Sequence, residues 1–180
     1  ELPGDIAGRL EAEALAVLAG LAAHPRILAF WQPRFRRFAE WFADTEPARR
    51  RHVVRQLAEV EGSLAFAAPG GPFKLTARAD RIDVLAAGGL FITDYKSGTV
   101  PSQKRVASGA APQLALEAAI AAGSGFEGLG AGPVLGLRYV KATGGEPPGL
   151  EQPIEVPDIA DLARKALDGV QRLVARFDDP

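Results

Sequence analysis

Three alternating segments, joined by two tight turns, constrain the fold more than any other feature of this sequence. The stretches 59–69, 73–85 and 90–96 place apolar residues at alternating positions, which is the period of a half-buried strand. The connections, 69-PGGP-72 and 86-AAGG-89, consist largely of the residues that tight turns favour. The sequence therefore predicts a three-stranded antiparallel meander.

Helical patterns surround this predicted meander. In chain order we expect helices within 8–57, the meander strands, a helix over 112–122, a strand over 134–142, an extended piece over 151–156 and a helix over 157–176. The last of the early helical segments runs from about Glu46 to Leu57. This order, with the sheet and its active site within 59–142, predicts a single α/β domain over 1–180, a mixed sheet flanked by helices. Because the first residue is Glu1, we expect a fragment of a larger chain.

An aromatic and arginine-rich segment, 26–46, has two interpretations. Six aromatic residues are interleaved there with Arg34, Arg36 and Arg37. Such a pattern can stack on bases and contact phosphates. It is also the pattern of a helix with a buried aromatic stripe and a solvated arginine face, and we favour this second interpretation.

Composition excludes several kinds of site. The chain has no cysteine, which excludes disulfides, thiolate zinc sites and an iron–sulfur cluster bound by this chain. The glycine-rich stretch 123–133 lacks the Gly-Lys-Ser/Thr ending of an ATPase phosphate loop. No apolar run approaches the roughly 20 residues that span a bilayer, so we expect no membrane association and a cytoplasmic location. The formal net charge of −1 neither supports nor excludes nucleic acid, since a local basic patch would suffice.

An acid and a base end the third predicted strand, in 93-TDYKSG-98. Asp94 and Lys96 lie two positions apart and so project from one face. Alone they could form a surface ion pair that contributes under about 1 kcal/mol. The preceding strand, however, supplies Asp80 and Asp83 in 77-ARADRID-83. Carboxylates on neighbouring strands with a lysine beside them indicate a Mg²⁺ or Mn²⁺ site, where the lysine activates water or stabilises charge on phosphate.

These two blocks, followed by 112-PQLALEAA-119, resemble the PD-(D/E)XK nuclease superfamily. The resemblance is closest to its RecB-like branch and to the C-terminal nuclease domains of AddB-type subunits of helicase–nucleases. It implies a restriction-endonuclease-like fold and a Mg²⁺-dependent DNA exonuclease, in which Mn²⁺ can replace Mg²⁺. It also implies action on single strands unwound by an AddA-like helicase motor, in double-strand break repair and recombination.

The resemblance assigns roles to individual residues. Asp80 and Asp94 would be the metal carboxylates, and the backbone carbonyl of Tyr95 would be a third oxygen ligand. Lys96 would be the catalytic lysine. Gln113 would complete the catalytic set, as the glutamine that binds DNA or orients the lysine.

Several assignments have alternatives. Asp83 is the rival of Asp80 as a ligand, and the two lie on opposite faces because they are three positions apart. The predicted turn does not fix the register, so the family pattern alone favours Asp80. Glu61 is a candidate accessory acid or a plain surface carboxylate. Lys104 and Arg105 are candidate phosphate contacts or part of a solvated loop.

Two departures from the family pattern affect the activity. RecB-like nucleases have a histidine on a helix before the strands, and neither His24 nor His52 has a matching context. Many relatives have a tyrosine where this chain has Glu117, one helical turn after Gln113. The missing histidine motivates an alternative function, a catalytically weak or inactive nuclease-fold module that guides or scaffolds DNA.

Overall fold

The structure, a computed structural model, describes residues 2–20 and 25–178. The elements of this part of the chain are α1 (Ile6–Ala19), α2 (Pro25–Arg49), β1 (Val53–Ala68), β2 (Gly71–Leu85), β3 (Leu90–Lys96), α3 (Gln103–Ala107), α4 (Gln113–Ala122), β4 (Val134–Ala142), β5 (Gly149–Pro153) and α5 (Ile159–Phe177). The strands form one sheet in the order β1-β2-β3-β4-β5. The predicted α/β architecture, a mixed sheet flanked by helices, is confirmed.

The chain divides into two compact units. The first contains the described residues of Glu1–His52 with Lys96–Thr99 and Val140–Glu151, and the second contains Val53–Tyr95, Val100–Tyr139 and the described residues of Gln152–Pro180. No helix among the described residues is long and apolar enough to cross a bilayer.

In the first unit, a side chain from the middle of α2 contacts the segment before β5, and ion pairs lie at the C-terminal end of the helix. The guanidinium of Arg37 donates to the Gly144 carbonyl at 2.9 and 2.6 Å. Buried Glu46 accepts from Arg49 and from Arg50, both at 2.7 Å. The two guanidinium groups compensate the charge of the buried Glu46 carboxylate. The helix end therefore contains these charged side chains without leaving the buried carboxylate unpaired.

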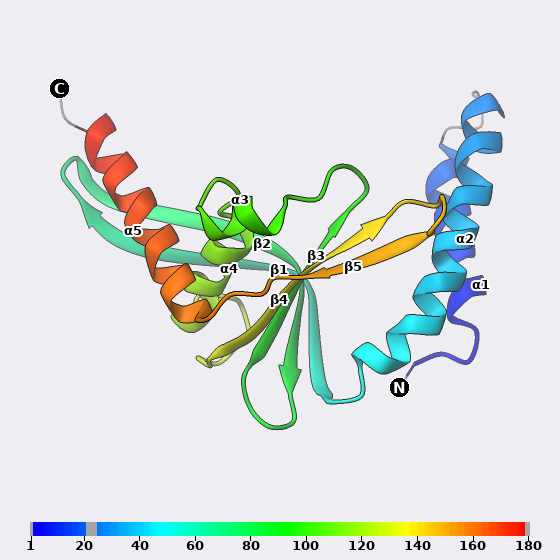
Figure 1. Ribbon diagram of the computed structural model, residues 1–180, viewed down its shortest axis with the longest axis horizontal. Coiled ribbons are helices and arrows are strands. Elements are labelled where there is room, and N and C mark those ends of the chain that lie inside the picture. The colour runs from blue at the N-terminus through cyan, green and yellow to red at the C-terminus, as the bar shows by residue number, and fades with distance from the viewer. Residues whose placement is uncertain (1, 21–24, 179–180) are drawn as a thin grey trace. The chain divides into compact units, whose positions relative to one another are not determined.

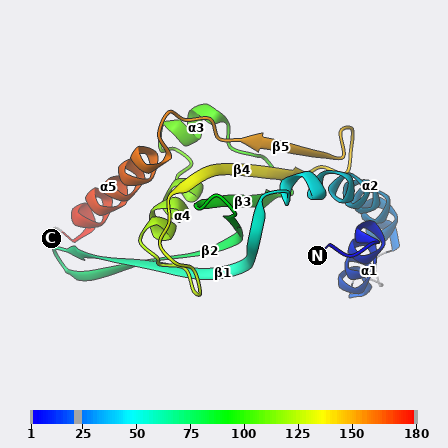
Figure 2. The ribbon, with the colours of Figure 1, turned by 90° about the horizontal axis from the view of Figure 1, so that it is seen from below.

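In the second unit, β1 and β2 form a long antiparallel hairpin, and β3 pairs antiparallel with β2. The predicted meander is therefore confirmed. Figures 1 and 2 show the C-terminal end of α5 close to the tip of this hairpin. At the hairpin tip the Gly70 N–H donates to Asp178 Oδ2 at 3.0 Å, which ties the tip to the end of α5.

The core of the second unit forms where α4 lies against the sheet (Figure 2). Leu114 and Ile120 of α4 are fully buried together with Ile82 of β2 and Ile92 of β3. The helix is almost entirely apolar over Gln113–Ala122, and burial of its aliphatic side chains is the main force that holds it there.

The alternation of buried and exposed side chains along β2 is interrupted next to Asp80. Before this residue Ala77 and Ala79 face the core, whereas after it Ile82 does. On β1, Ala58 pairs with Arg81 and Val60 pairs with Ala79. Glu59, between them, lies opposite Asp80 and has a backbone φ of 52°. A residue in the left-handed region interrupts the alternation of a strand. Asp80 therefore lies half-buried at the margin of the core.

Two predictions about the helices are corrected by the structure. The third helical segment over Glu46–Leu57 is wrong, because α2 ends at Arg49 and β1 begins at Val53. Leu57 pairs with Ile82 across the hairpin, so strand pairing and burial override the local helical pattern. The predicted loop before α4 contains the short helix α3, capped by the Ser102 side chain. His24 lies outside the described residues.

Candidate active site

The candidate site begins where β2 and β3 lie side by side. Arg81 pairs with Thr93, and Asp80 and Asp94 are the next residues along their strands, just beyond this pair. The Tyr95 N–H donates to Asp80 Oδ2 at 2.7 Å, a charge-assisted hydrogen bond across the two strands. Asp80 and Asp94 therefore lie near each other, where the paired part of the two strands ends.

The first residue of α4 contacts this pair of carboxylates. Asp94 is only 1% exposed, and the Gln113 side-chain amide donates to its Oδ1 at 2.5 Å. Gln113 itself is exposed at the helix start. The helix thus presents a polar group to β3 at its first turn and an apolar surface beyond it.

Two further polar residues lie close to Asp94. Glu117, one turn after Gln113, is 3% exposed and accepts from the same amide at 3.1 Å. Burial, and then the negative charges of Asp94 and Glu117, raise the pKa of Tyr139 on β4 to about 12. Tyr139 is therefore a neutral phenol at neutral pH.

Sequence reasoning had not assigned Glu117 or Tyr139 to the site. A charged residue in the apolar helix 113-QLALEAAIAA-122, one turn from a site residue, was the available signal for Glu117. Tyr139 gave no comparable signal, because a tyrosine in a strand is ordinary for a core.

Asp83 lies on the opposite face of β2 from Asp80. Arg81 Nε donates to both carboxylate oxygens of Asp83 at 2.9 Å, and Arg138 lies 3.8 Å away. The side chains of Arg81 and Asp83 are 2% and 1% exposed. Arg81 also donates to the Tyr95 hydroxyl at 3.3 Å. The structure thus brings Asp80 near Asp94, and Asp83 into a buried ion pair behind it.

Lys96, the last residue of β3, is counted with the first unit. It follows Asp94 by two positions, so alternation along the strand directs both side chains to one face. Its catalytic role stays a prediction.

The remaining predicted residues lie on the surface. Lys104 and Arg105 are exposed on α3, where Arg105 reaches the Ala110 carbonyl at 3.5 Å. Glu61 is exposed on β1 opposite Arg78 and lines a polar groove of about 490 Å³ on the hairpin. Their proposed contacts with phosphate or metal stay predictions.

The donor set of the site suits a magnesium ion better than a zinc ion. Among the residues that the structure describes, no group of three or more His, Cys, Asp or Glu side chains could hold a metal. Mg²⁺ needs only one or two carboxylates, because waters and substrate oxygens complete its shell. In an antiparallel pair the N–H and C=O of one residue point to the same side. By this rule the Tyr95 carbonyl would point, like its N–H, toward the strand of Asp80; its role as a third oxygen ligand stays a prediction.

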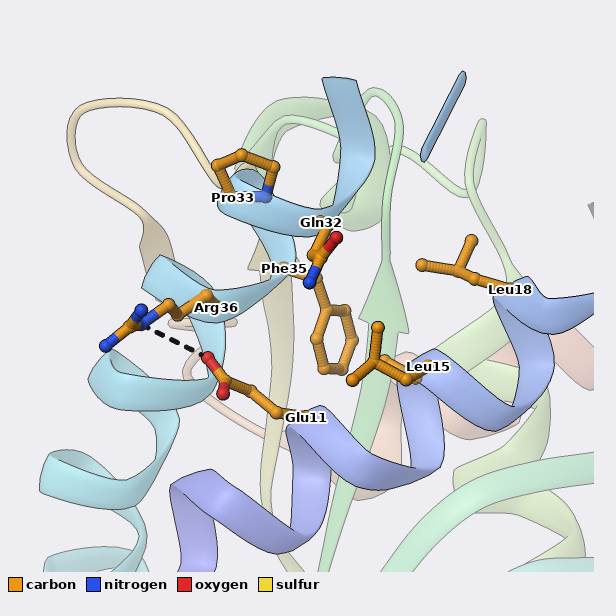
Figure 3. Close-up of a pocket in the computed structure, with 8 residues that line it drawn as sticks. Glu11, Leu15, Leu18, Gln32, Pro33, Phe35 and Arg36 are labelled. Carbon is orange, nitrogen blue, oxygen red and sulfur yellow. Dashed lines mark ion pairs between the residues drawn. The ribbon is translucent and has the colours of Figure 1, made fainter. Parts of the chain in front are cut away.

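A separate pocket lies in the first unit, between α1 and α2 (Figure 3). It has a volume of about 210 Å³ and is lined mainly by apolar side chains such as Leu15, Leu18 and Phe35. Glu11 and Arg36 form an ion pair of 3.3 Å at its edge. Among the described residues that line it, the charged ones, Glu11 and Arg36, pair with each other, so they offer no comparable catalytic constellation.

The aromatic residues of α2 divide into two groups. Phe38, Trp41 and Phe42 are partly buried and in ring contact, as the favoured interpretation predicts. Phe30 and Trp31 are 55% and 49% exposed.

Comparison with known proteins adds a family match. Residues 4–180 match the model of the PD-(D/E)XK nuclease superfamily. A solved structure described as that of SSO0001 aligns with 91% of this chain and 69% of its own, at 19% identity and a TM-score of 0.40.

The curated relatives are uncharacterized proteins of Rickettsia. A protein of Rickettsia typhi is 32% identical over 96 residues, which is 53% of this chain and 11% of that protein. A protein of Rickettsia felis is 31% identical over 120 residues, which is 65% of this chain and 14% of that protein. The chain therefore matches only a small part of the length of these relatives.

Proposed function

Because the chain belongs to the PD-(D/E)XK nuclease superfamily, whose members generally use divalent metal ions, we propose that it is a Mg²⁺-dependent deoxyribonuclease domain. The observation that carries this proposal is the hydrogen bond of 2.7 Å from the Tyr95 N–H to Asp80 Oδ2, which ties Asp80 of β2 to the residue that follows Asp94 on β3. Two carboxylates placed in this way offer a hard cation a negatively charged oxygen site.

The residues of the site have separate tasks in this mechanism. Asp80, Asp94 and the Tyr95 carbonyl would hold the ion. When bound, a divalent ion polarises the scissile phosphate and lowers the pKa of a water nucleophile. The Tyr95 N–H orients Asp80, and the Gln113 amide orients Asp94.

Lys96 stabilises negative charge on the phosphate as the phosphodiester bond breaks. An ammonium group positioned in advance stabilises a transition state more than the ground state, because charge accumulates on the phosphate oxygens during the reaction. Lys104 and Arg105 would contact phosphates of the bound strand without reading its sequence.

We also propose the biological setting. The proposal is supported by the resemblance of the three sequence blocks to AddB-type nuclease domains, which act as exonucleases in double-strand break repair and recombination. The substrate would be single-stranded DNA supplied by an AddA-like helicase partner in the cytoplasm.

The proposal is tested by cleavage of a 5′-labelled single-stranded oligonucleotide in Mg²⁺, with an EDTA control. We expect the wild-type chain to cut, and Asp94→Asn and Lys96→Ala to lose at least about 100-fold in rate, the scale on which such charge-stabilising groups act. Lys74→Ala, an exposed lysine elsewhere on the hairpin, is the matched control and should cut normally. Equal cutting by the wild type and Lys96→Ala would exclude the catalytic assignment.

A scaffold without useful activity is the second candidate. It is favoured by the donor set, since the described residues include no group of three or more His, Cys, Asp or Glu side chains that could hold a metal. Retained binding of single-stranded DNA, without cleavage in either Mg²⁺ or Mn²⁺, would support it.

A further inference from the structure

The side-chain amide of Gln113 is clamped between two carboxylates. Its nitrogen donates to Asp94 Oδ1 at 2.5 Å and to Glu117 Oε1 at 3.1 Å. A primary amide has two N–H donors, and a carboxylate oxygen accepts but does not donate when ionised. Both donors of Gln113 therefore have acceptors, and the amide oxygen must point away from them.

Glu117 is an unusual residue for its position. It is 3% exposed on a helix whose other buried residues are Leu, Ile and Ala, and it lies in the same cluster as the buried carboxylate of Asp94. Burying a second negative charge there costs stability, whereas an apolar residue of similar volume would be neutral or stabilising. Its presence is therefore better explained by a task at the site than by packing.

We infer that Glu117 is a positioning residue, which fixes the orientation of the Gln113 amide and, through it, the carboxylate of Asp94. The terminal torsion of a glutamine is broad and nearly two-fold, so a single hydrogen bond does not hold the amide. The second bond, to Glu117, selects the orientation in which nitrogen faces Asp94. The clamp is the pair of hydrogen bonds from the Gln113 amide to Asp94 and Glu117. Its effect on cleavage rests on the proposed function, whereas the hydrogen bonds themselves do not.

The clamp is tested first without any activity, by NMR of the 15N-labelled chain. The sequence has six glutamines and no asparagine, so the side-chain amide of Gln113 is readily assigned by its loss in Gln113→Ala. In Glu117→Leu we expect one of the two Gln113 amide protons to shift upfield and to exchange faster with solvent. In Glu117→Gln, which keeps an acceptor oxygen, both protons should stay near their wild-type positions. Unchanged resonances in Glu117→Leu would overturn the inference.

Cleavage of single-stranded DNA in Mg²⁺ gives the second readout. Residues that orient metal ligands typically affect activity by about 10- to 100-fold, so Glu117→Leu should lower kcat by that factor, with little change in KM. Glu117→Gln should retain most of the activity. In a Gln113→Ala background, Glu117→Leu should have no further effect, because Glu117 acts through Gln113.

The outcomes separate the two claims. Equal losses from Glu117→Leu in the wild-type and Gln113→Ala backgrounds would overturn the positioning role. No cleavage by any variant, with the amide resonances shifted as expected, would instead refute the proposed function and leave the clamp standing. An unchanged melting temperature in Glu117→Leu shows that any loss of activity does not reflect unfolding.

Discussion

Replacing Asp83 or Asp80 by alanine should have opposite consequences for stability and function. Asp83 accepts two hydrogen bonds from Arg81 behind the site, and both side chains are almost fully buried. Asp80 is half-buried and accepts one backbone hydrogen bond. We therefore expect Asp83 to stabilise the fold and Asp80 to act at the proposed metal site.

The magnitudes follow from what each substitution leaves behind. Asp83→Ala leaves the guanidinium of Arg81 buried beside Arg138 without its carboxylate, which costs about 3–5 kcal/mol. For a chain of this size that loss lowers the melting temperature by about 6–20 °C. Asp80→Ala removes one hydrogen bond, which destabilises the fold, and a like charge next to Asp94, which stabilises it. The free energy of unfolding should therefore fall by less than about 1.5 kcal/mol.

Urea unfolding followed by circular dichroism measures both free energies, and Mn²⁺ titration calorimetry measures the site. We expect Asp83→Ala to be strongly destabilised. We expect Asp80→Ala to be nearly as stable as the wild type and to have lost Mn²⁺ binding. Equal destabilisation by the two substitutions, or retained Mn²⁺ binding by Asp80→Ala, would refute the assignment of the two aspartates.

Two further predictions concern the second unit. With Tyr95→Phe in place, the remaining phenol of Tyr139 should titrate near pH 12 in the absorbance at 295 nm, and a normal value near 10 would contradict its burial beside carboxylates. Because the pKa of Tyr139 is raised in the folded state, the stability that this residue contributes is complete below about pH 10 and is lost as the pH rises toward 12. Tyr139→Phe should abolish this loss of stability. Gly62→Ala would place a methyl group 2.4 Å from the buried ring of Phe126 and should cost about 1–3 kcal/mol in urea unfolding. Gly98→Ala, where a methyl group meets nothing within 4 Å, is its control and should be neutral.

The meander was predictable because strand alternation and turn chemistry act over a few residues. The three strands around Asp80 and Asp94, and the helix that starts at Gln113, follow directly from local patterns in the sequence. The third predicted helix was wrong because the pairing of β1 with β2 is a long-range interaction, which no local pattern of Glu46–Leu57 reports.

The relation between the two aspartates of β2 was only partly predictable. Alternation places Asp80 and Asp83 on opposite faces, but the face that meets Asp94 depends on the register of β2 with β3. The ion pair of Asp83 with Arg81 and the burial of Glu117 likewise depend on which surfaces α4 and β4 cover. These features arise from packing, so sequence spacing alone left them open.

A crystal structure of the chain soaked in Mn²⁺ would decide whether Asp80 and Asp94 form a divalent-metal site. Anomalous scattering should locate one ion within ligand distance, about 2.1 Å, of a carboxylate oxygen of each of these two residues. The Tyr95 carbonyl should be a third ligand, and the Arg81–Asp83 pair should remain intact. An ion bound by Asp83 instead, or no ion at Asp94 at saturating Mn²⁺, would contradict the proposed metal site.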